Sequence, residues 1–310
     1  MEQATRGRLS GRTQVEDPVV VPLFAFAAAL ILGAVVMAAT GVDLATIGQS
    51  YVALVRGSVG SIYAISETLT AAAPLVLAGL GLALGFRAGL FNIGAEGQVI
   101  MGGLAAVVAG VALGGMPVII ALPGAILAGA CAGAFYASIA GWLRAVTGAH
   151  EVISTIMLNL ISYRLLDYLL RTPLIQKEGR ADPISKSVPD AAELPRLLTF
   201  IDVNLRLHAG IFLTLAMVAV AYWLLFRSKL GFEFRASGEN VVAARFAGMN
   251  AGLTIVMAMA IAGALAGLAG ANQVLGVLDR ATPGFSAGIG FDAIAVALLG
   301  RSHPVGVLLA

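Results

Sequence analysis

Charged residues and cysteine are scarce in this chain. Asp, Glu, Lys and Arg make up 12% of its 310 residues, about half the share of a typical soluble domain, whereas 59% are hydrophobic. The single cysteine, Cys131, lies in an apolar run, which excludes a disulfide framework and a cysteine-based metal site. We expect it to be a small, buried packing residue. The composition predicts a helical protein with several membrane spans.

Residues for phosphate binding and metal catalysis are also missing. None of the three lysines follows a glycine, so the sequence contains no GxxxxGK[ST] phosphate-binding loop. His150-Glu151 begins like a zinc-protease motif, but Ser154 occupies the position of the second histidine. The net charge of +2 gives no indication of a nucleic-acid partner. We therefore predict a protein without metal or cofactor that is not an enzyme and does not hydrolyse ATP by itself.

Apolar runs recur at the length that a helix needs to cross about 30 Å of hydrocarbon. About eight membrane spans are predicted, at residues 19–40, 68–86, 91–113, 117–143, 152–170, 207–226, 252–277 and 289–310. The third and the eighth contain enough glycine and polar residues to be broken or re-entrant helices. The eighth stops without polar flanking residues, so we expect the chain to be truncated or the final helix to be incomplete.

The polar segments between these runs give the predicted domain organisation. Residues 1–18 form a polar tail, and residues 19–310 form one transmembrane domain. The first run is longer than the core of a signal peptide and more runs follow, which favours a span with the tail in the cytoplasm. Residues 171–206 are then an external loop and residues 227–251 a cytoplasmic loop, although the Lys and Arg counts favour this orientation only slightly. Residues 41–66 are expected to hold a short helix.

Pairs of glycines one helical turn apart predict close packing between helices. They are Gly81 and Gly85, Gly129 and Gly133, and Gly263 and Gly267. In lipid, small residues let two helix backbones approach and gain van der Waals contact.

Polar side chains within the apolar runs are candidates for a solute path, because burying them in a bilayer is costly. Asn92 and Glu96 are one helical turn apart and should share a face, which Gln98 joins only if glycines break the helix. Two interpretations of Glu96 are open: it caps a neighbouring broken helix, or it lines a path. Interhelical hydrogen bonding is the alternative for every candidate. The candidates are Glu67, Asn92, Glu96, Gln98, Asn159, Asn272, Gln273 and Asp292.

A charged segment, GFEFRASGENVVAARFAGMN at residues 231–250, separates two apolar runs. Ser237 is a suitable N-cap, Glu239 then lies in the first turn, and Gly248 is a suitable C-terminal stop. An apolar stripe follows at helical spacing, formed by Val242, Phe246 and Met249. The pattern predicts an amphipathic helix of about ten residues that lies on the membrane or docks in a groove of a partner.

The last part of this segment, GENVVAARFAGMN, resembles the cytoplasmic coupling segment of permease subunits in bacterial ABC importers. The family serves branched-chain amino acids, simple sugars and nucleosides. Three further stretches resemble its sugar and nucleoside branch: FRAGLFNIGAEGQVIMGG at 86–103, EVISTIMLN at 151–159 and GFDAIAVALLGRSHP at 290–304. The resemblance extends from about Thr68 to the end, and FNIGAEGQ together with EVISTIMLN is its most specific part.

The resemblance implies an all-α, polytopic helical bundle of the type II importer kind in the bacterial cytoplasmic (inner) membrane. The chain would form half of a channel for nucleosides or simple sugars, beside a second, related permease subunit. A separate ABC ATPase subunit would supply the missing phosphate-binding loop, and an extracytoplasmic solute-binding lipoprotein would deliver the solute. The residues implied to contact the ATPase are Gly238, Glu239, Asn240, Ala244, Arg245, Phe246 and Gly248.

Two other functions are compatible with the composition. A self-sufficient secondary transporter or channel for a small polar solute would explain the spans and Glu96, but it leaves the charged segment without a function. An integral membrane enzyme would need catalytic residues that the sequence does not offer. Neighbouring genes for an ATPase, a second permease and a binding lipoprotein would favour the importer.

Overall fold

The computed structural model describes residues 20–310, so the predicted tail lies outside the described residues. This part of the chain is helical and contains no β-strand, only two isolated β-bridges. The elements are α1 (Val20–Ala39), α2 (Leu44–Val59), α3 (Ile62–Arg87), α4 (Ala95–Leu113), α5 (Val118–Thr147), α6 (Glu151–Leu169), η2 (Asp190–Ala192), α7 (Gly210–Arg227), α8 (Lys229–Glu239), α9 (Val241–Phe246), α10 (Ala251–Gln273), η3 (Val274–Leu278), α11 (Ile289–Leu299) and α12 (Pro304–Leu309).

Seven of the described helices are long and apolar enough to span a membrane, which confirms the all-α polytopic fold. The eighth predicted span is not one helix. Residues 289–310 form α11, of 11 residues, and α12, of 6 residues, with Arg301 and Ser302 in the left-handed region between them. The break expected in this run is therefore present. The break expected in the third run is absent from α4 itself, because the glycine-containing turn at 88–94 precedes the helix.

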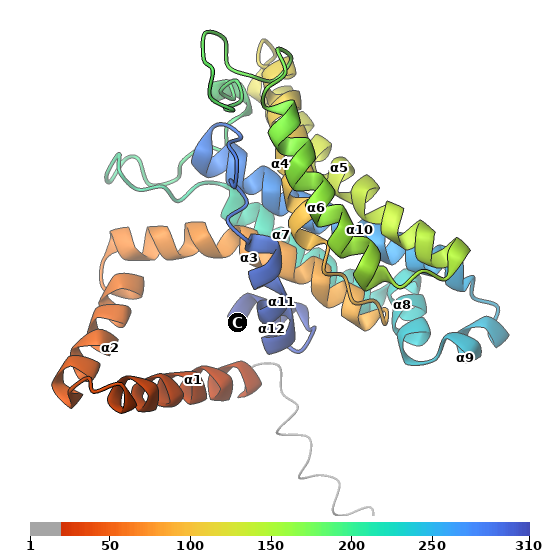
Figure 1. The fold of residues 1–310 in the computed structure, drawn as a ribbon, viewed down its shortest axis with the longest axis horizontal. Helices are drawn as coiled ribbons and strands as arrows, with labels where there is room; N and C mark the ends of the chain where they lie inside the picture. Colours follow the sequence, from red (N-terminus) through yellow and green to blue (C-terminus); the bar gives the residue numbers. More distant parts are fainter. Residues whose placement is uncertain (1–19) are drawn as a thin grey trace, which may run out of the picture.

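The bundle has two ends with different connections (Figure 1). One end, here the loop end, carries residues 170–209, which connect α6 to α7. The other end, here the α9 end, carries the turn at 88–94 and the pair α8 and α9, which projects beyond the spanning helices. Polar segments thus gather at the two ends, as a membrane-spanning bundle requires.

Helix α10 forms the centre of the bundle and packs against α3, α4 and α5. A Cβ atom on Gly133 would lie 2.2 Å from the carbonyl oxygen of Gly263, and one on Gly267 would lie 2.3 Å from that of Gly129. The close packing predicted from paired glycines is therefore confirmed between α5 and α10. Cys131 is exposed, contrary to expectation, because α5 buries the face that carries Gly129 and Gly133.

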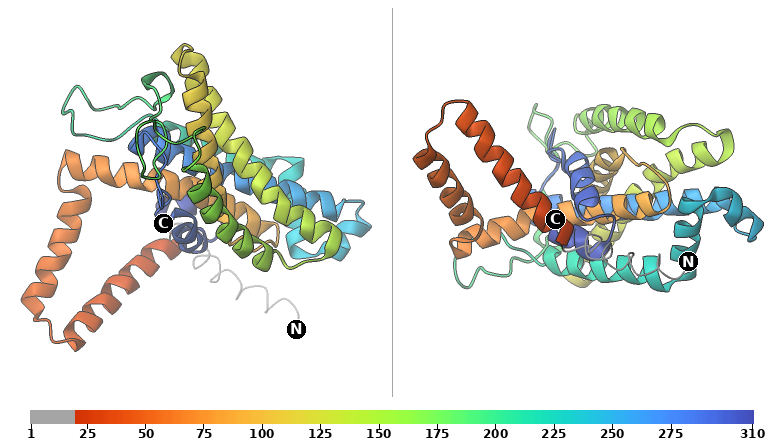
Figure 2. Two further views of the ribbon diagram at one scale, coloured as in Figure 1. Left: turned by 45° about the horizontal axis from the view of Figure 1, so that its top comes forward. Right: turned by 90° about the horizontal axis from the view of Figure 1, so that it is seen from below.

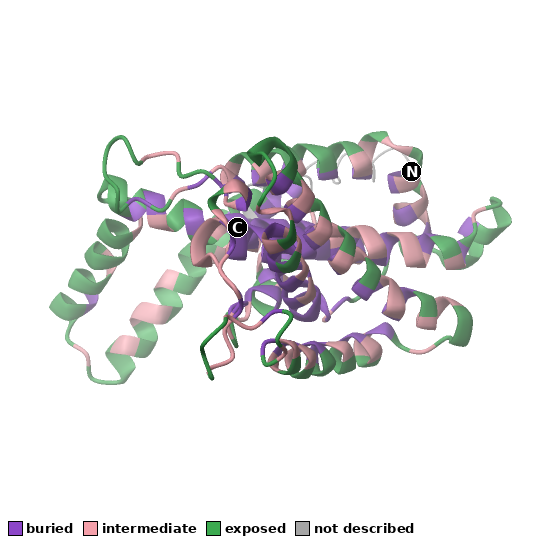
Figure 3. Cartoon of the chain, turned by 90° about the horizontal axis from the view of Figure 1, so that it is seen from above, coloured by how far each residue is buried: buried purple, intermediate pink, exposed green. Residues whose placement is uncertain are grey.

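Helices α1 and α2 form an arm that stands away from the bundle (Figures 1 and 2). Only 6% of the apolar window in α1 is buried, whereas buried residues gather in the middle of the bundle (Figure 3). The expected short helix in residues 41–66 is α2, which has 16 residues and begins where the Asp43 side chain accepts a hydrogen bond from the Thr46 backbone N–H.

Candidate functional site

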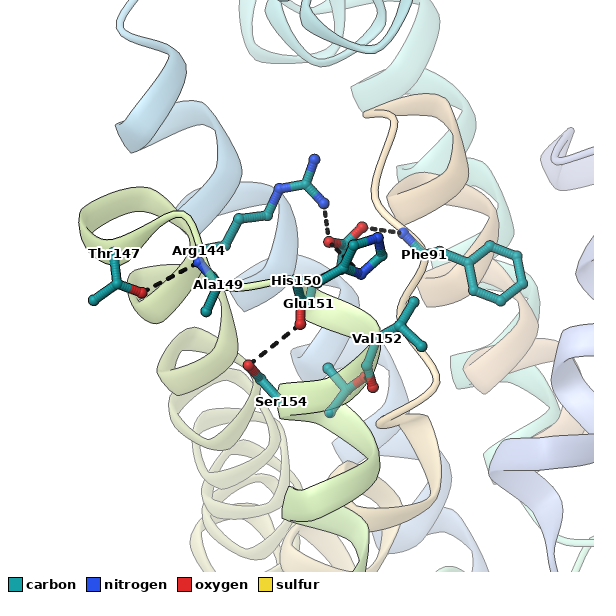
Figure 4. A network of polar contacts seen from close by, with 9 residues as sticks. Phe91, Arg144, Thr147, Ala149, His150, Glu151, Val152 and Ser154 are labelled. Carbon is teal, nitrogen blue, oxygen red and sulfur yellow. Dashed lines mark hydrogen bonds and ion pairs between the residues drawn. The ribbon is translucent and has the colours of Figure 1, made fainter.

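The turn at 88–94 and helix α6 carry the two most specific sequence segments, and they are in contact. One Glu151 oxygen accepts a hydrogen bond from the Phe91 backbone N–H at 3.1 Å, and the other forms an ion pair with Arg144 at the end of α5 (Figure 4). Glu151 is 3% exposed. The ion pair and the hydrogen bond neutralise this carboxylate and fix the turn against two helices at the α9 end.

Asn159, two turns further along α6, holds the next part of the same turn. Its Oδ1 accepts from the Gly97 backbone N–H at 2.8 Å, and its Nδ2 donates to the Ile93 carbonyl at 2.9 Å. Gly97 lies in the first turn of α4, where backbone N–H groups lack partners within the helix. Asn159 therefore satisfies the start of α4, and it is 3% exposed.

Asn92 and Gln98 form a closed amide pair. Asn92 Nδ2 donates to Gln98 Oε1 at 3.0 Å, and Gln98 Nε2 donates to Asn92 Oδ1 at 3.1 Å. The prediction that Asn92 shares a helix face with Glu96 is wrong, because α4 begins only at Ala95 and Asn92 lies in the preceding turn. All three side-chain hydrogen bonds of the pair, including that of the Gly94 N–H to Asn92 Oδ1 at 2.9 Å, lie inside the protein.

Glu96 is fully buried between the N-termini of α4 and α11. Its Oε1 accepts from Ser286 Oγ at 2.5 Å and from the Tyr163 hydroxyl at 3.1 Å, and its Oε2 accepts from the Gly290 backbone N–H at 2.8 Å. Gly290 lies in the first turn of α11. Of the two interpretations of Glu96, these contacts describe the first, because the carboxylate caps the half-length helix α11.

The other end of α11 is held by Arg87. Its Nε donates to the Ser302 carbonyl at 3.0 Å and its Nη2 to the Arg301 carbonyl at 3.4 Å. These two residues have φ angles of 52° and 53°, which are uncommon for residues with a side chain. Helix α11 is thus fixed at its start by α4 and at its end by α3.

The other predicted path residues lie outside the contacts among the turn at 88–94, α4, α6 and α11. Glu67 forms an ion pair with Arg206 at the loop end. Asn272 is 1% exposed, and Gln273 is half-buried at the end of α10. Asp292 is exposed on α11, and its carboxylate makes no hydrogen bond or ion pair with the described residues.

The charged segment folds differently from the prediction. Helix α8 continues to Glu239, and Asn240 caps the six-residue helix α9 by accepting from the Ala243 N–H at 3.0 Å. Ser237 is therefore not the N-cap; it is buried within α8. Gly248 ends the segment with φ of 83°, as expected.

Helix α9 presents its apolar side chains to the outside. Phe246 is 90% exposed and Val242 is 62% exposed, whereas Ala244 is buried. Between α3 and α8, a cavity of about 330 Å³ is lined by Phe86, Arg87, Phe232, Arg235, Ala236, Gly238 and Glu239.

Several residues of these networks were not predicted from the sequence: Arg87, Arg144, Glu151 and Tyr163. One signal was available for α6, since Glu151, Thr155, Asn159 and Ser162 recur at helical spacing in an apolar helix. The partners of Glu151 and Asn159 at Phe91, Ile93 and Gly97 lie about 60 residues earlier in the sequence and follow no spacing rule.

Comparison with known proteins agrees with the fold and with the four quoted segments. Residues 64–310 match the family described as branched-chain amino acid transport system / permease component, and the chain belongs to this family. It is therefore a multi-pass membrane protein and a transporter subunit, as the resemblance implied. No solved structure matches.

Three relatives illustrate the similarity. The guanosine ABC transporter permease protein NupP of Bacillus subtilis is 41% identical over 291 residues, which cover 94% of this chain and 82% of NupP. The glucose ABC transporter permease protein TsgB13 of Haloferax volcanii is 37% identical over 93% of this chain and 76% of its own length. The guanosine ABC transporter permease protein NupQ of Bacillus subtilis is 28% identical over 79% of this chain and 77% of its own length.

Proposed function

We propose that this permease forms half of the channel of a bacterial ABC importer in the cytoplasmic membrane and that residues 238–250 dock on a separate ATPase subunit. The exposure of Phe246 carries the proposal. This side chain is 90% exposed and belongs to α9, a helix that projects beyond the spanning helices (Figure 1). A large apolar side chain in that position fits a groove on a partner.

The packing of α8 offers a route from the docked segment to the bundle. A Cβ atom on Gly238 would lie 2.3 Å from the Arg87 carbonyl oxygen and 2.9 Å from the Gly89 nitrogen. Arg87 in turn binds the carbonyls at the end of α11. A displacement of α8 and α9 by the ATPase would therefore act directly on the turn at 88–94 and on α11.

The substrate and the other partners follow from the relatives. The names of NupP and TsgB13 indicate guanosine and glucose, so a nucleoside or a simple sugar is the proposed solute. Two related guanosine permeases in Bacillus subtilis support pairing with a second, related permease. An extracytoplasmic binding lipoprotein would deliver the solute at the loop end, and Asp292 is the candidate path residue that this chain leaves exposed.

The first test is purification of the tagged permease from native membranes, with identification of the co-purifying proteins by mass spectrometry. We expect an ATPase and a second permease to co-purify. Phe246→Asp should lose the ATPase and keep the second permease, because an aspartate cannot occupy an apolar groove. Phe200→Asp is the matched control: Phe200 is 81% exposed at the loop end, and its replacement should leave the ATPase bound.

Two results would overturn the proposal. Purification of the protein alone or as a homo-oligomer would favour a self-sufficient transporter. Retention of the ATPase by Phe246→Asp would place the docking surface elsewhere.

A further inference from the structure

Two buried polar side chains meet at the loop end, outside the networks described above. His208 precedes α7 and Asn272 lies near the end of α10, and each is 1% exposed. Both approach the same point, since a Cβ atom on Gly210 would lie 2.3 Å from Asn272 Nδ2 and 2.7 Å from His208 Nδ1.

The polar atoms of this pair lack partners. His208 Nδ1 accepts a hydrogen bond from the Gly210 N–H at 3.2 Å, so in the neutral imidazole Nε2 carries the proton. Neither that Nε2 nor the two amide atoms of Asn272 has a hydrogen-bond partner in the described part of the chain. Buried polar atoms without a partner are rare, and each needs an explanation.

The surrounding backbone makes room for the two side chains. A Cβ atom on Gly276 would lie 2.4 Å from His208 Cε1 and 2.5 Å from Nε2, so any larger residue there would collide with the ring. Gly276 belongs to η3, a π-helical turn, and such turns are frequent at functional sites.

Leu194 and Pro195, in the loop at 170–209 that also contains His208, cover this position. The Leu194 N–H donates to the Leu275 carbonyl at 2.8 Å, and the Ala209 N–H donates to the Pro195 carbonyl at 2.9 Å. Two backbone hydrogen bonds thus hold the segment at 194–195 over η3 and beside His208. Separation of this segment from η3 would open the pair toward the loop end.

We propose that His208 and Asn272 form a binding site for the uncharged polar groups of the transported solute, closed in this conformation by the loop segment at 194–195. The imidazole offers one N–H donor, and the carboxamide offers donors and an acceptor, which together match a hydroxyl group or the amide edge of a base. The site rests on the proposed function, because it assigns part of the solute path to these residues.

The test is uptake by proteoliposomes that contain the complete complex with its ATPase, second permease and binding protein. Guanosine and glucose are the probes, and each is compared with analogues that lack one polar group: 2′-deoxyguanosine, 3′-deoxyguanosine, inosine and the monodeoxyglucoses. Half-saturation constants are measured for the wild type, Asn272→Leu, His208→Leu and His208→Gln.

We expect Asn272→Leu and His208→Leu to raise the half-saturation constant for the full solute about 10-fold, the loss that corresponds to one hydrogen bond. The analogue that lacks the bound group should then be disfavoured by the wild type but not by these variants. His208→Gln retains a donor and should restore part of the affinity. Discrimination by the binding protein is common to all variants and cancels in this comparison.

Asn204→Leu is the matched control, because Asn204 is exposed in the same loop. Its replacement should change neither the half-saturation constant for the full solute nor that for the analogues. If the leucine variants keep the full discrimination against every analogue, the site is overturned and the pair holds only structural water. If the wild-type complex takes up neither probe, the proposed substrate class fails before any variant is compared, and the site fails with it.

Discussion

Asn159 is the predicted path residue whose observed contacts are the most informative. It is predicted from the sequence as a candidate for the solute path, with interhelical hydrogen bonding as the alternative, and its observed partner is the backbone at Ile93 and Gly97. That partner lies more than 60 residues earlier in the sequence, so spacing rules predict the need for a contact but not the contact itself. The remaining polar stripe of α6 was recognisable by the same periodicity.

For Glu96, too, the sequence predicts that a partner is needed but does not identify the partner. A carboxylate in an apolar run must be paired, hydrated or functional, and the sequence left capping and path lining open. Its partners Ser286 and Gly290 lie about 190 residues later, one just before the eighth predicted span and the other at its start. Capping could be recognised only after α11 was seen to begin at Ile289.

His208 gives a prediction at the scale of one residue. Burial, together with the positive charge of Arg196, lowers the pKa of His208 from 6.5 to about 4. Between these values the unfolded chain binds a proton that the folded protein does not, so stability falls as the pH falls from 6.5 to 4. At pH 4.5 the loss relative to pH 7 amounts to about 2–3 kcal/mol.

Thermal unfolding of the purified protein in detergent at pH 7 and pH 4.5 measures this loss. His208→Gln has no group that titrates there, so its unfolding temperature should fall by several degrees less than that of the wild type. Equal losses in both proteins would show that His208 does not carry the pH dependence.

At the scale of elements, the position of α9 was predicted and its boundaries were not. Ser237 and Asn240 are both good capping residues, and the sequence pattern favoured the first. Tertiary packing decides otherwise, because Ser237 and Gly238 lie against the turn at 87–89 and extend α8. Helix α9 is consequently shorter than expected, but it presents the predicted apolar side chains Val242 and Phe246.

The contact between α4 and α11 leads to a prediction at the same scale. A Cβ atom on Gly290 would lie 2.1 Å from the Glu96 nitrogen and 2.3 Å from its Cα, both backbone atoms that cannot turn aside. Gly290→Ala should therefore displace α11, break its cap by Glu96 and destabilise the protein by about 1–3 kcal/mol. The uptake rate of the reconstituted complex should also fall.

The unfolding temperature in detergent and the uptake rate test this expectation. Gly57→Ala is the matched control, since Gly57 lies inside α2 with no atom near the position of its Cβ. This control should be neutral or more stable by up to about 1 kcal/mol, as alanine favours a helix over glycine. A Gly290→Ala variant that behaves like the control would mean that α11 has no fixed position on α4.

At the scale of the whole molecule, the apolar runs predicted about eight spans, and seven of the described helices are long and apolar enough to cross a membrane. The difference lies in residues 289–310, where length alone suggested a span. Gly300, the two left-handed residues and Pro304 instead divide the segment into α11 and α12. High hydropathy indicates that such a run is buried in protein or lipid, but it does not indicate whether the chain crosses the membrane or turns back within it.

Asp292 gives the prediction that concerns the complete assembly. Asp292 is exposed on α11, and the adjacent Phe291 is 43% exposed. No residue among 20–310 forms an ion pair with the Asp292 carboxylate. A carboxylate on an apolar helix is tolerated when it faces water or a partner subunit. If the channel alternates between two states, the access of water to this position should change with the nucleotide bound to the ATPase.

Labelling of Asp292→Cys with a charged maleimide tests this, in a Cys131→Ser background because Cys131 is itself exposed. The rate should differ several-fold between the nucleotide-free complex and the complex trapped with ATP and vanadate. Asn204→Cys, exposed at the loop end, should be labelled in both states, and Ala269→Cys, fully buried in α10, in neither. Equal rates for Asp292→Cys in both states would place α11 on the lipid-facing side of the permease and leave the path to other residues.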